Sequence, residues 1–416
     1  MKKSSSKPSF LQSLLKATRM TGLGRLVEAT RRMQKSFFKT VVGQGTGGAP
    51  DPVSADATGW ATGQGGAAVP VYLMPRTSVN DTVIDVRPSE PGHQPSHQSC
   101  SDEGPPAEAL KPIARHAAFT EKTFLFDGER YPYRLYVPAA PLTPQAAAAS
   151  SAGGALPLIV LLHGCQQDAY DFSRGTAMNE LADKHGFMVL YPEQISKANS
   201  QMCWNWFEPG HQQLGRGEPG MIAALTKHIL ASQQEGEGDK ALAIADAGRV
   251  YIAGLSAGGA MAAVVAGLYP DLFAALGVHS GLPAGSAQNL LSAFSAMRLG
   301  AKGEVVPALP TIVFHGCADK TVHPDNGDNI IDAAVVALEA SGRSLHKQSS
   351  GLGDSKDQNV KRIAYRADDG RSFVEHWQVG DGQHAWSGGD AKGSFTDPDG
   401  PSASAAMLAF FLQHKK

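Results

Sequence analysis

The fold of this chain is decided by one stretch of sequence, Arg249-Val250-Tyr251-Ile252-Ala253-Gly254-Leu255-Ser256-Ala257-Gly258. Its first half is an apolar run typical of a buried strand, and residues 259–269 have the Ala, Val and Met content of a helix. A G-x-S-x-G pentapeptide between strand and helix is typical of a nucleophile elbow, in which the serine occupies a strained turn. The bare pentapeptide also arises by chance among 46 glycines. Its context nevertheless favours Ser256 as a nucleophile, because side chains at 254 and 258 would collide with the strand and helix.

Apolar strands alternate with helical segments through the second part of the chain. Residues 119–126 and 131–137 read as a hairpin around Asp127-Gly128. Further apolar runs predict strands at 156–162, 186–191, 274–279 and 311–314, and a late strand near 363–365 or 374–379. Helices are expected at 176–184, 221–232, 330–340 and 402–414. This pattern predicts an α/β fold, a mostly parallel sheet with helices on both faces and its chemistry at the carboxyl ends of the strands.

The N-terminal part of the chain has a different composition. Residues 1–42 carry ten Lys or Arg against one acid, Glu28, with apolar residues at helical spacing. Such a basic amphipathic segment can lie on an anionic or apolar surface, or pack on the protein. Residues 43–117 are rich in Gly, Pro and Ser and read as a flexible linker. We therefore expect a helical tail at 1–42, a linker at 43–117 and a catalytic domain at 118–416.

Overall composition excludes several classes of function. The 37 basic and 39 acidic side chains nearly balance, so no nucleic-acid partner is expected. No stretch approaches the ~18 apolar residues that a membrane span requires. The four cysteines contain no C-x-x-C element, and neither a metal nor an organic cofactor is implied. These features favour a cytoplasmic protein, with secretion as the alternative.

A serine hydroxyl near neutral pH needs a base that takes its proton and an acid that orients the base. In a fold with this elbow the order along the chain is serine, acid, histidine. Asp319 follows the strand at 311–314, and His384 lies in a loop before the closing helix, so we expect these two residues to serve Ser256. The alternatives for the acid are Asp325 and Asp328, and those for the base are His323 and His376.

Ester or amide cleavage also needs hydrogen-bond donors for the developing oxyanion. One expected donor is the backbone N–H of Ala257, which follows the nucleophile. The other should come from the loop that begins His163-Gly164-Cys165, where Gly164 lets the main chain approach a substrate and the Cys165 amide is the candidate donor. The alternative for His163 and Gly164 is an ordinary tight turn.

A second loop carries an unusual group of aromatic residues, Cys203-Trp204-Asn205-Trp206-Phe207. Its side chains are expected to contribute to substrate binding by lining an apolar pocket, with a purely structural aromatic plug as the alternative. If this loop folds over the strand ends, Cys203 can bond Cys165 and fix the oxyanion loop. Both thiols remaining free is equally consistent with the sequence.

At these residues the chain resembles the polyhydroxybutyrate (PHB) depolymerase esterases, an α/β-hydrolase group related to feruloyl and acetylxylan esterases. The resemblance covers roughly residues 118–412. It rests on the ordered segments 161–165, Tyr191-Pro192-Glu193-Gln194, 203–207, 249–261 and Tyr269-Pro270-Asp271-Leu272-Phe273. It implies that Ser256, Asp319 and His384 occupy the triad positions and Cys165 the oxyanion position. One departure is Cys317, where the family more often has a small residue such as Thr. We also expect no C-terminal polymer-binding domain of the kind that secreted depolymerases carry.

The expected function is that of a serine esterase acting on short-chain hydroxyacyl esters such as polyhydroxybutyrate or its oligomers. A feruloyl or acetylxylan esterase is the alternative within enzymes. A reading of another class is a binding protein that uses its basic tail on a polyhydroxybutyrate granule or a membrane surface. The N-terminal segment is similar to the leader of predicted intracellular family members, which agrees with a cytoplasmic, granule-associated protein.

Overall fold

The structure is a computed structural model that describes residues 118–138, 154–232, 244–304, 308–351 and 359–416. The expected basic tail at 1–42 and linker at 43–117 lie outside the described residues, so the division into three segments stays a prediction. Within the described ranges, no helix combines the length and apolarity needed to cross a bilayer.

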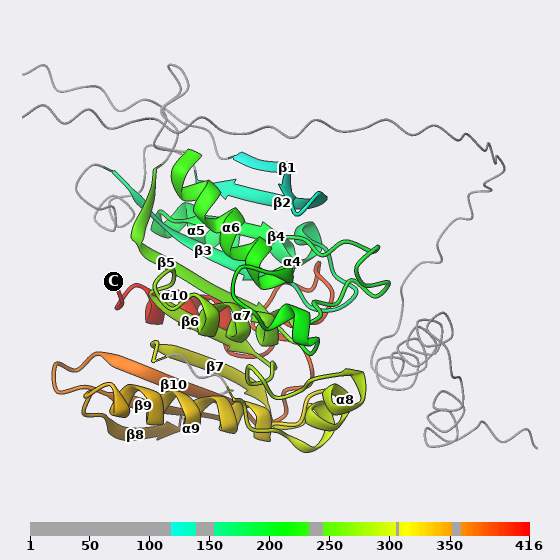
Figure 1. Cartoon of the computed structure of the whole chain (residues 1–416). Coiled ribbons are helices and arrows are strands. Elements are labelled where there is room, and N and C mark those ends of the chain that lie inside the picture. The colour runs from blue at the N-terminus through cyan, green and yellow to red at the C-terminus, as the bar shows by residue number, and fades with distance from the viewer. Residues whose placement is uncertain (1–117, 139–153, 233–243, 305–307, 352–358) are drawn as a thin grey trace, which may run out of the picture. The chain divides into compact units, whose positions relative to one another are not determined.

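A ten-stranded sheet with the order β1-β2-β4-β3-β5-β6-β7-β10-β9-β8 organises the described residues (Figure 1). Neighbours from β4 to β10 run parallel, while β1, β2, β9 and β8 pair antiparallel at the two sides. The prediction of a mostly parallel sheet is therefore confirmed. The strands are β1 Ala118–Phe126, β2 Glu129–Val137, β3 Leu156–Leu162, β4 Met188–Pro192, β5 Ala245–Leu255, β6 Ala275–His279, β7 Thr311–Gly316, β8 His346–Gly351, β9 Val360–Arg366 and β10 Ser372–Val379.

Helices cover both faces of the sheet because the central strands are apolar on both faces. Alternate residues of β3 show this, since Leu158 and Val160 belong to one core cluster and Ile159 and Leu161 to the other. Helices α6, α7, α8 and α9 pack in the first cluster and α4, α5 and α10 in the second. Figure 1 shows α6, α7 and α9 in front of the sheet and α10 behind it. Their bounds are α4 Ala169–Thr176, α5 Met178–His185, α6 Gly217–Ser232, α7 Ala257–Leu268, α8 Leu290–Leu299, α9 Asp325–Ala340 and α10 Ala403–Phe411.

Several details differ from the sequence expectation, and neither α8 nor β8 was expected. The helix expected at 176–184 is α5, and a separate helix that was not expected, α4, precedes it; Ala177 lies between them in a left-handed conformation with φ 51°. Both alternatives for the late strand are present, as β9 and β10. Two short elements, the 3₁₀ helix η1 at Pro209–His211 and a β11–β12 pair at Trp386–Ser387 and Thr396–Asp397, had no sequence signal.

Candidate active site

The turn between β5 and α7 holds Ser256 in a conformation that non-glycine residues rarely adopt, with φ 57° and ψ −120°. Its neighbours must be small. A Cβ at Gly254 would lie 2.4 Å from the backbone of Gly258, and one at Gly258 would lie 2.2 Å from the carbonyl oxygen of Leu162. The second contact also shows that the elbow packs directly on the end of β3, where the loop with Cys165 begins. This is the geometry of a nucleophile elbow.

Two loops bring an imidazole and a carboxylate to this serine. His384 Nε2 lies 2.9 Å from Ser256 Oγ, and His384 Nδ1 lies 2.7 Å from Asp319 Oδ2. Because a carboxylate only accepts, Nδ1 carries the proton and Nε2 is free to accept the serine proton. The other carboxylate oxygen, Asp319 Oδ1, accepts the backbone N–H groups of Thr321 at 2.8 Å and Val322 at 2.9 Å. The structure therefore brings the three expected side chains into one hydrogen-bonded line.

The environment keeps Asp319 ionised. Burial alone would raise its pKa, but the charge and hydrogen bond of His384, the nearby His315 and the backbone N–H of Val322 lower the pKa to about 2. An ionised carboxylate holds the His384 ring in the tautomer described above and stabilises the imidazolium that forms on proton transfer.

The alternative acids and bases lie elsewhere. Asp325 is in the first turn of α9, with its carboxylate 3.4 Å from His323 Nδ1. Asp328 Oδ1 accepts from Gln378 Nε2 at 3.2 Å and lies 3.6 Å from His376 Nδ1. Both ring nitrogens of His384 already have partners in Ser256 and Asp319. The Asp325–His323 and Asp328–His376 pairs therefore take no part in the hydrogen-bonded line of Ser256, His384 and Asp319.

The two amides expected to form an oxyanion hole lie on adjoining segments. Neither the Cys165 nor the Ala257 backbone N–H has a protein acceptor among the described residues. Gly164, in contrast, donates its N–H to Gln167 Oε1 at 2.9 Å. Gln167 in turn donates from Nε2 to the carbonyl oxygen of Ser394 at 2.9 Å, which ties this loop to the segment that follows His384.

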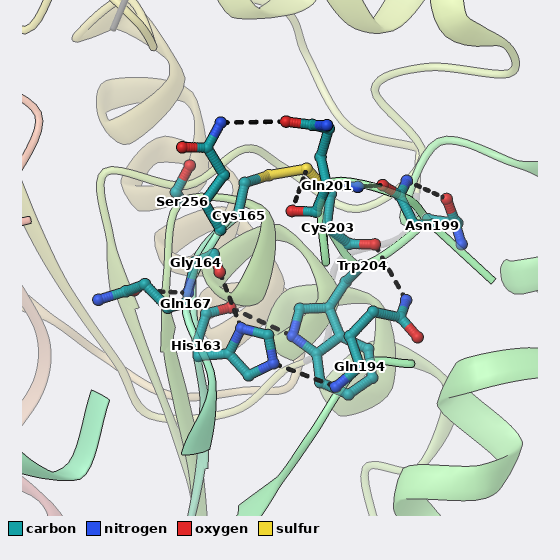
Figure 2. The surroundings of a disulfide bond; sticks show 12 residues. His163, Gly164, Cys165, Gln167, Gln194, Asn199, Gln201, Cys203, Trp204 and Ser256 are labelled. Carbon is teal, nitrogen blue, oxygen red and sulfur yellow. Dashed lines mark hydrogen bonds between the residues drawn. A yellow bond between two sulfur atoms is a disulfide. The ribbon is translucent and has the colours of Figure 1, made fainter. Parts of the chain in front are cut away.

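A disulfide joins Cys165 to Cys203, so of the two possibilities that the sequence leaves open the structure has the bonded one (Figure 2). The Cα atoms are 4.2 Å apart. The bond attaches the loop after β3 to the aromatic loop, and the backbone hydrogen bond from Gln166 N to Gln201 O, 2.8 Å long, runs beside it. Cys317 is exposed and unpaired.

The aromatic loop lies mostly inside the protein. Trp204 has no exposed surface, and its Nε1 donates to the carbonyl oxygen of His163 at 3.2 Å. Trp206 and Phe207 pack edge to face in the same core cluster. Asn205 is buried and hydrogen-bonded to Glu218. In the structure these side chains support the loop that carries Gly164 and Cys165, and their contribution to substrate binding stays a prediction.

His163 is buried as well, and its ring is neutral. It accepts the backbone N–H of Gln194 at Nε2 over 3.1 Å, while Nδ1 lies 2.8 Å from the carbonyl oxygen of Gly164. Burial lowers the pKa of His163 to about 4. The residue therefore acts on the conformation of the loop rather than as a charged group.

Sequence reasoning missed four buried polar residues that contact this machinery, namely Gln167, Gln194, Glu218 and His279. The burial and the partners of these residues arise only from tertiary packing. Glu218, for example, stands at the start of α6, where an acidic residue usually interacts with the helix dipole at the surface. Nothing in the local sequence indicates that the Glu218 side chain is only 1% exposed.

Comparisons with known proteins agree with this geometry. The family model described as "Esterase PHB depolymerase" matches residues 133–339. The chain is 36% identical over 191 residues to poly(3-hydroxyalkanoate) depolymerase C of Paucimonas lemoignei, a match that covers 42% of this chain and 44% of that protein. Over residues 133–339 the chain is similar to the PHB depolymerase esterase family.

Other similar proteins are esterases by name. Feruloyl esterase B of Neurospora crassa is 29% identical over 281 residues, which cover 61% of this chain and 82% of that protein. The solved structure of an acetyl xylan esterase from Aspergillus awamori superposes with a TM-score of 0.51 at 18% identity, covering 71% of this chain and 98% of that one. The fold is therefore the α/β-hydrolase fold. The chain spans less than half the length of the Paucimonas depolymerase.

Proposed function

We propose that the protein is a serine carboxylic ester hydrolase with Ser256 as nucleophile. The observation that carries this proposal is the bridge that His384 makes, 2.9 Å to Ser256 Oγ and 2.7 Å to Asp319 Oδ2. The strained elbow and the depressed pKa of Asp319, about 2, support the same reading. A line of hydroxyl, imidazole and carboxylate is the arrangement that activates a serine for acyl transfer.

In the proposed mechanism His384 Nε2 takes the proton as Ser256 Oγ attacks the ester carbonyl carbon. The backbone N–H groups of Cys165 and Ala257 donate to the oxyanion, which develops as the carbonyl bond becomes single. His384 then gives the proton to the leaving alcohol, and an acyl-enzyme remains on Ser256. A water molecule that the same imidazole deprotonates releases the acid and restores the hydroxyl.

The proposed substrates are short-chain hydroxyacyl esters, including polyhydroxybutyrate or its oligomers. The family model and the named depolymerase relatives support this class. The test is a rate comparison with purified protein on hydroxybutyrate oligomers, solid polymer and p-nitrophenyl butyrate. Preference for the hydroxybutyrate oligomers supports the proposal, and hydrolysis of none of the three esters contradicts it.

A feruloyl or acetylxylan esterase is the second candidate. The feruloyl esterase relative of Neurospora crassa, aligned over 82% of its length, favours it. Methyl ferulate and acetylated xylan in the same panel separate the two candidates, because the preferred acyl group gives the higher kcat/KM.

Binding to a granule or membrane surface is proposed for residues 1–42 alone, on the strength of their ten basic side chains. Deletion of this segment should abolish co-sedimentation with granules or anionic vesicles and leave hydrolysis of p-nitrophenyl butyrate unchanged. Equal co-sedimentation of the full chain and the deletion variant would contradict a surface-binding role.

Two observations bear on the cellular compartment of the protein, and they point in opposite directions. The similarity of the N-terminal segment to the leader of predicted intracellular family members favours the cytoplasm, whereas a disulfide such as Cys165–Cys203 persists mainly in oxidising compartments. We take cytoplasm as the proposal and export as the alternative that the disulfide favours. Fractionation of cells of the source organism decides between them, since an exported protein appears outside the cytosolic fraction with the disulfide intact.

A further inference from the structure

We propose that Glu218 is a positioning residue that holds the Cys165 amide in place from both sides. The inference rests on the proposed ester hydrolysis, because it assigns the conformation of one oxyanion donor. Glu218 contacts neither Ser256 nor His384 in the structure. It acts instead through two chains of hydrogen bonds that begin at its carboxylate and end on either side of Cys165.

The Glu218 side chain is buried in the core cluster at the start of α6, where it is 1% exposed. Three donors point at its two oxygens. Oε1 accepts from Gln194 Nε2 at 2.6 Å and from Asn205 Nδ2 at 2.7 Å, and Oε2 accepts from the backbone N–H of Asn205 at 2.7 Å. A buried carboxylate with three donors is strongly held, because loss of either partner leaves an uncompensated polar group.

The first chain runs through Gln194 to the residues before Cys165. The Gln194 backbone N–H donates to His163 Nε2 at 3.1 Å, and His163 Nδ1 lies 2.8 Å from the carbonyl oxygen of Gly164. That carbonyl belongs to the same peptide group as the Cys165 N–H. Its direction therefore sets the direction of the proposed oxyanion donor, since a peptide group is planar.

The second chain runs through Asn205 to the residue after Cys165. Asn199 Nδ2 donates to Asn205 Oδ1 at 2.8 Å, and Asn199 Oδ1 accepts the N–H of Gln201 at 2.9 Å. The carbonyl oxygen of Gln201 then accepts the N–H of Gln166 at 2.8 Å. Figure 2 shows Asn199 and Gln201 near the disulfide between Cys165 and Cys203.

The disulfide gives a third connection between Glu218 and Cys165, in addition to the two chains of hydrogen bonds. Gln194 Nε2, which donates to Glu218, also donates to the carbonyl oxygen of Cys203 at 2.9 Å. Cys203 is bonded to Cys165 through sulfur. Glu218 is therefore the point at which the peptide before Cys165, the peptide after it and its disulfide partner are held together.

The chemistry of the site requires a carboxylate rather than an amide. An amide at 218 would turn an NH₂ group toward donors of Gln194 or Asn205, so at least one of these hydrogen bonds would be lost. The other ionisable groups that face Glu218 bring no positive charge to it. His211 Nδ1 accepts the Glu218 backbone N–H at 3.0 Å, and its pKa is lowered by burial, so its ring is neutral. The remaining ionisable neighbours, Glu208 and Tyr131, carry no positive charge.

The test compares Glu218→Gln with Glu375→Gln, a matched control. Glu375 is 2% exposed and also accepts three hydrogen bonds, two from Arg362 and one from Trp377 Nε1, but it lies in β10. Glu218→Gln should lower kcat for p-nitrophenyl butyrate roughly ten- to a hundredfold with little change in KM, because a displaced oxyanion donor weakens only the transition state. Affinity for 1-butaneboronic acid, which forms a tetrahedral serine adduct, should fall by a similar factor. Glu375→Gln should change neither quantity.

Hydrogen exchange of the segment 163–167 gives a readout that does not need activity. Glu218→Gln should speed exchange there, and Glu375→Gln should not. The proposal would be overturned if a folded Glu218→Gln protein had the kcat, the boronate affinity and the hydrogen-exchange rate of the wild type. It would also be overturned if Glu218→Gln and Glu375→Gln changed these three quantities equally. If Glu218→Gln does not fold, Glu218→Asp replaces it, with the same expected directions. An inactive wild-type enzyme with faster exchange in the variant would refute ester hydrolysis and leave the role of Glu218 in the loop standing.

Discussion

The backbone N–H of Ser256 donates to the carbonyl oxygen of His279 over 2.9 Å. The ring of the same histidine accepts, at Nε2, the N–H of Ser387 over 3.0 Å, three residues after His384. It stacks with Phe314 and with Trp386 and is 1% exposed. His279 therefore joins the nucleophile turn to the loop of the proposed base.

Replacement of His279 by Phe should lower kcat about tenfold, because the stacked ring remains but the Ser387 N–H loses its acceptor and the His384 loop shifts. A buried unsatisfied N–H also costs about 1–3 kcal/mol of stability. The measurement is kcat for p-nitrophenyl butyrate together with the free energy of unfolding. His414→Phe is the control, since His414 is equally buried and donates to Ser372 O at the other end of the sheet. A loss of stability in both variants with unchanged kcat would contradict this role.

Gly254→Ala and Gly258→Ala should each destabilise the protein by about 3 kcal/mol or more and abolish activity, because the new Cβ meets backbone atoms that cannot move independently. Gly210→Ala is the control. A Cβ there has nothing within 4 Å, and the change should stay within about 0.5 kcal/mol. Thermal unfolding checks all three variants, and an elbow variant as stable and active as Gly210→Ala would show that the turn is misassigned.

The stability of the protein should depend on pH through Glu218. Burial raises its pKa to about 7 from 4.5, even though the hydrogen bonds from Gln194 and Asn205 oppose the shift. Between these values the folded protein binds a proton that the unfolded chain has lost, so the free energy of unfolding falls as pH rises. The difference in unfolding free energy, wild type minus Glu218→Gln, should therefore fall by about 3 kcal/mol from pH 4.5 to 7. The buried histidines are present in both proteins, so their contributions to the pH dependence cancel in this difference. A difference in unfolding free energy that does not change with pH would contradict the raised pKa of Glu218.

Much of the fold could be predicted because burial on both faces leaves a clear mark in sequence. The strands β3, β5, β6 and β7 are apolar runs, and the Asp127-Gly128 turn signals the β1–β2 hairpin. The strand β8 could not be predicted, since its sequence, HKQSSG, is polar and borders the sheet on one side only. The boundary between α4 and α5 at Ala177 could not be predicted either, because nothing in the sequence indicates that an alanine will adopt a positive φ.

The site was predictable to the extent that chain order and strand ends determine it. Ser256 and His384 are 128 residues apart, yet the order of the motifs along a parallel sheet brings them to one edge. Glu218 and His279 were not predictable, because a polar residue gives no local sign of whether it will be buried. The burial of Trp204 was not predictable either, because a tryptophan in a loop is equally typical of pocket lining and of core.

The disulfide should stabilise the protein by about 2–4 kcal/mol, since it closes a loop between residues 38 apart. The double variant Cys165→Ser/Cys203→Ser should lose this stability and also lower kcat, because the loop with the proposed oxyanion donor is released from its anchor. Cys317→Ser, at an exposed free thiol, should change neither. Unfolding in urea and initial rates measure both effects, and a double variant that behaves like Cys317→Ser would contradict an anchoring role.

The most direct test of the account is hydrolysis of p-nitrophenyl butyrate by Ser256→Ala. The small side chain fits the elbow, so Tm should stay close to that of the wild type. Loss of the hydroxyl that lies 2.9 Å from His384 Nε2 should lower kcat by at least about a thousandfold. Near-normal hydrolysis by the folded variant would contradict the assignment of Ser256 as nucleophile, and with it the mechanism.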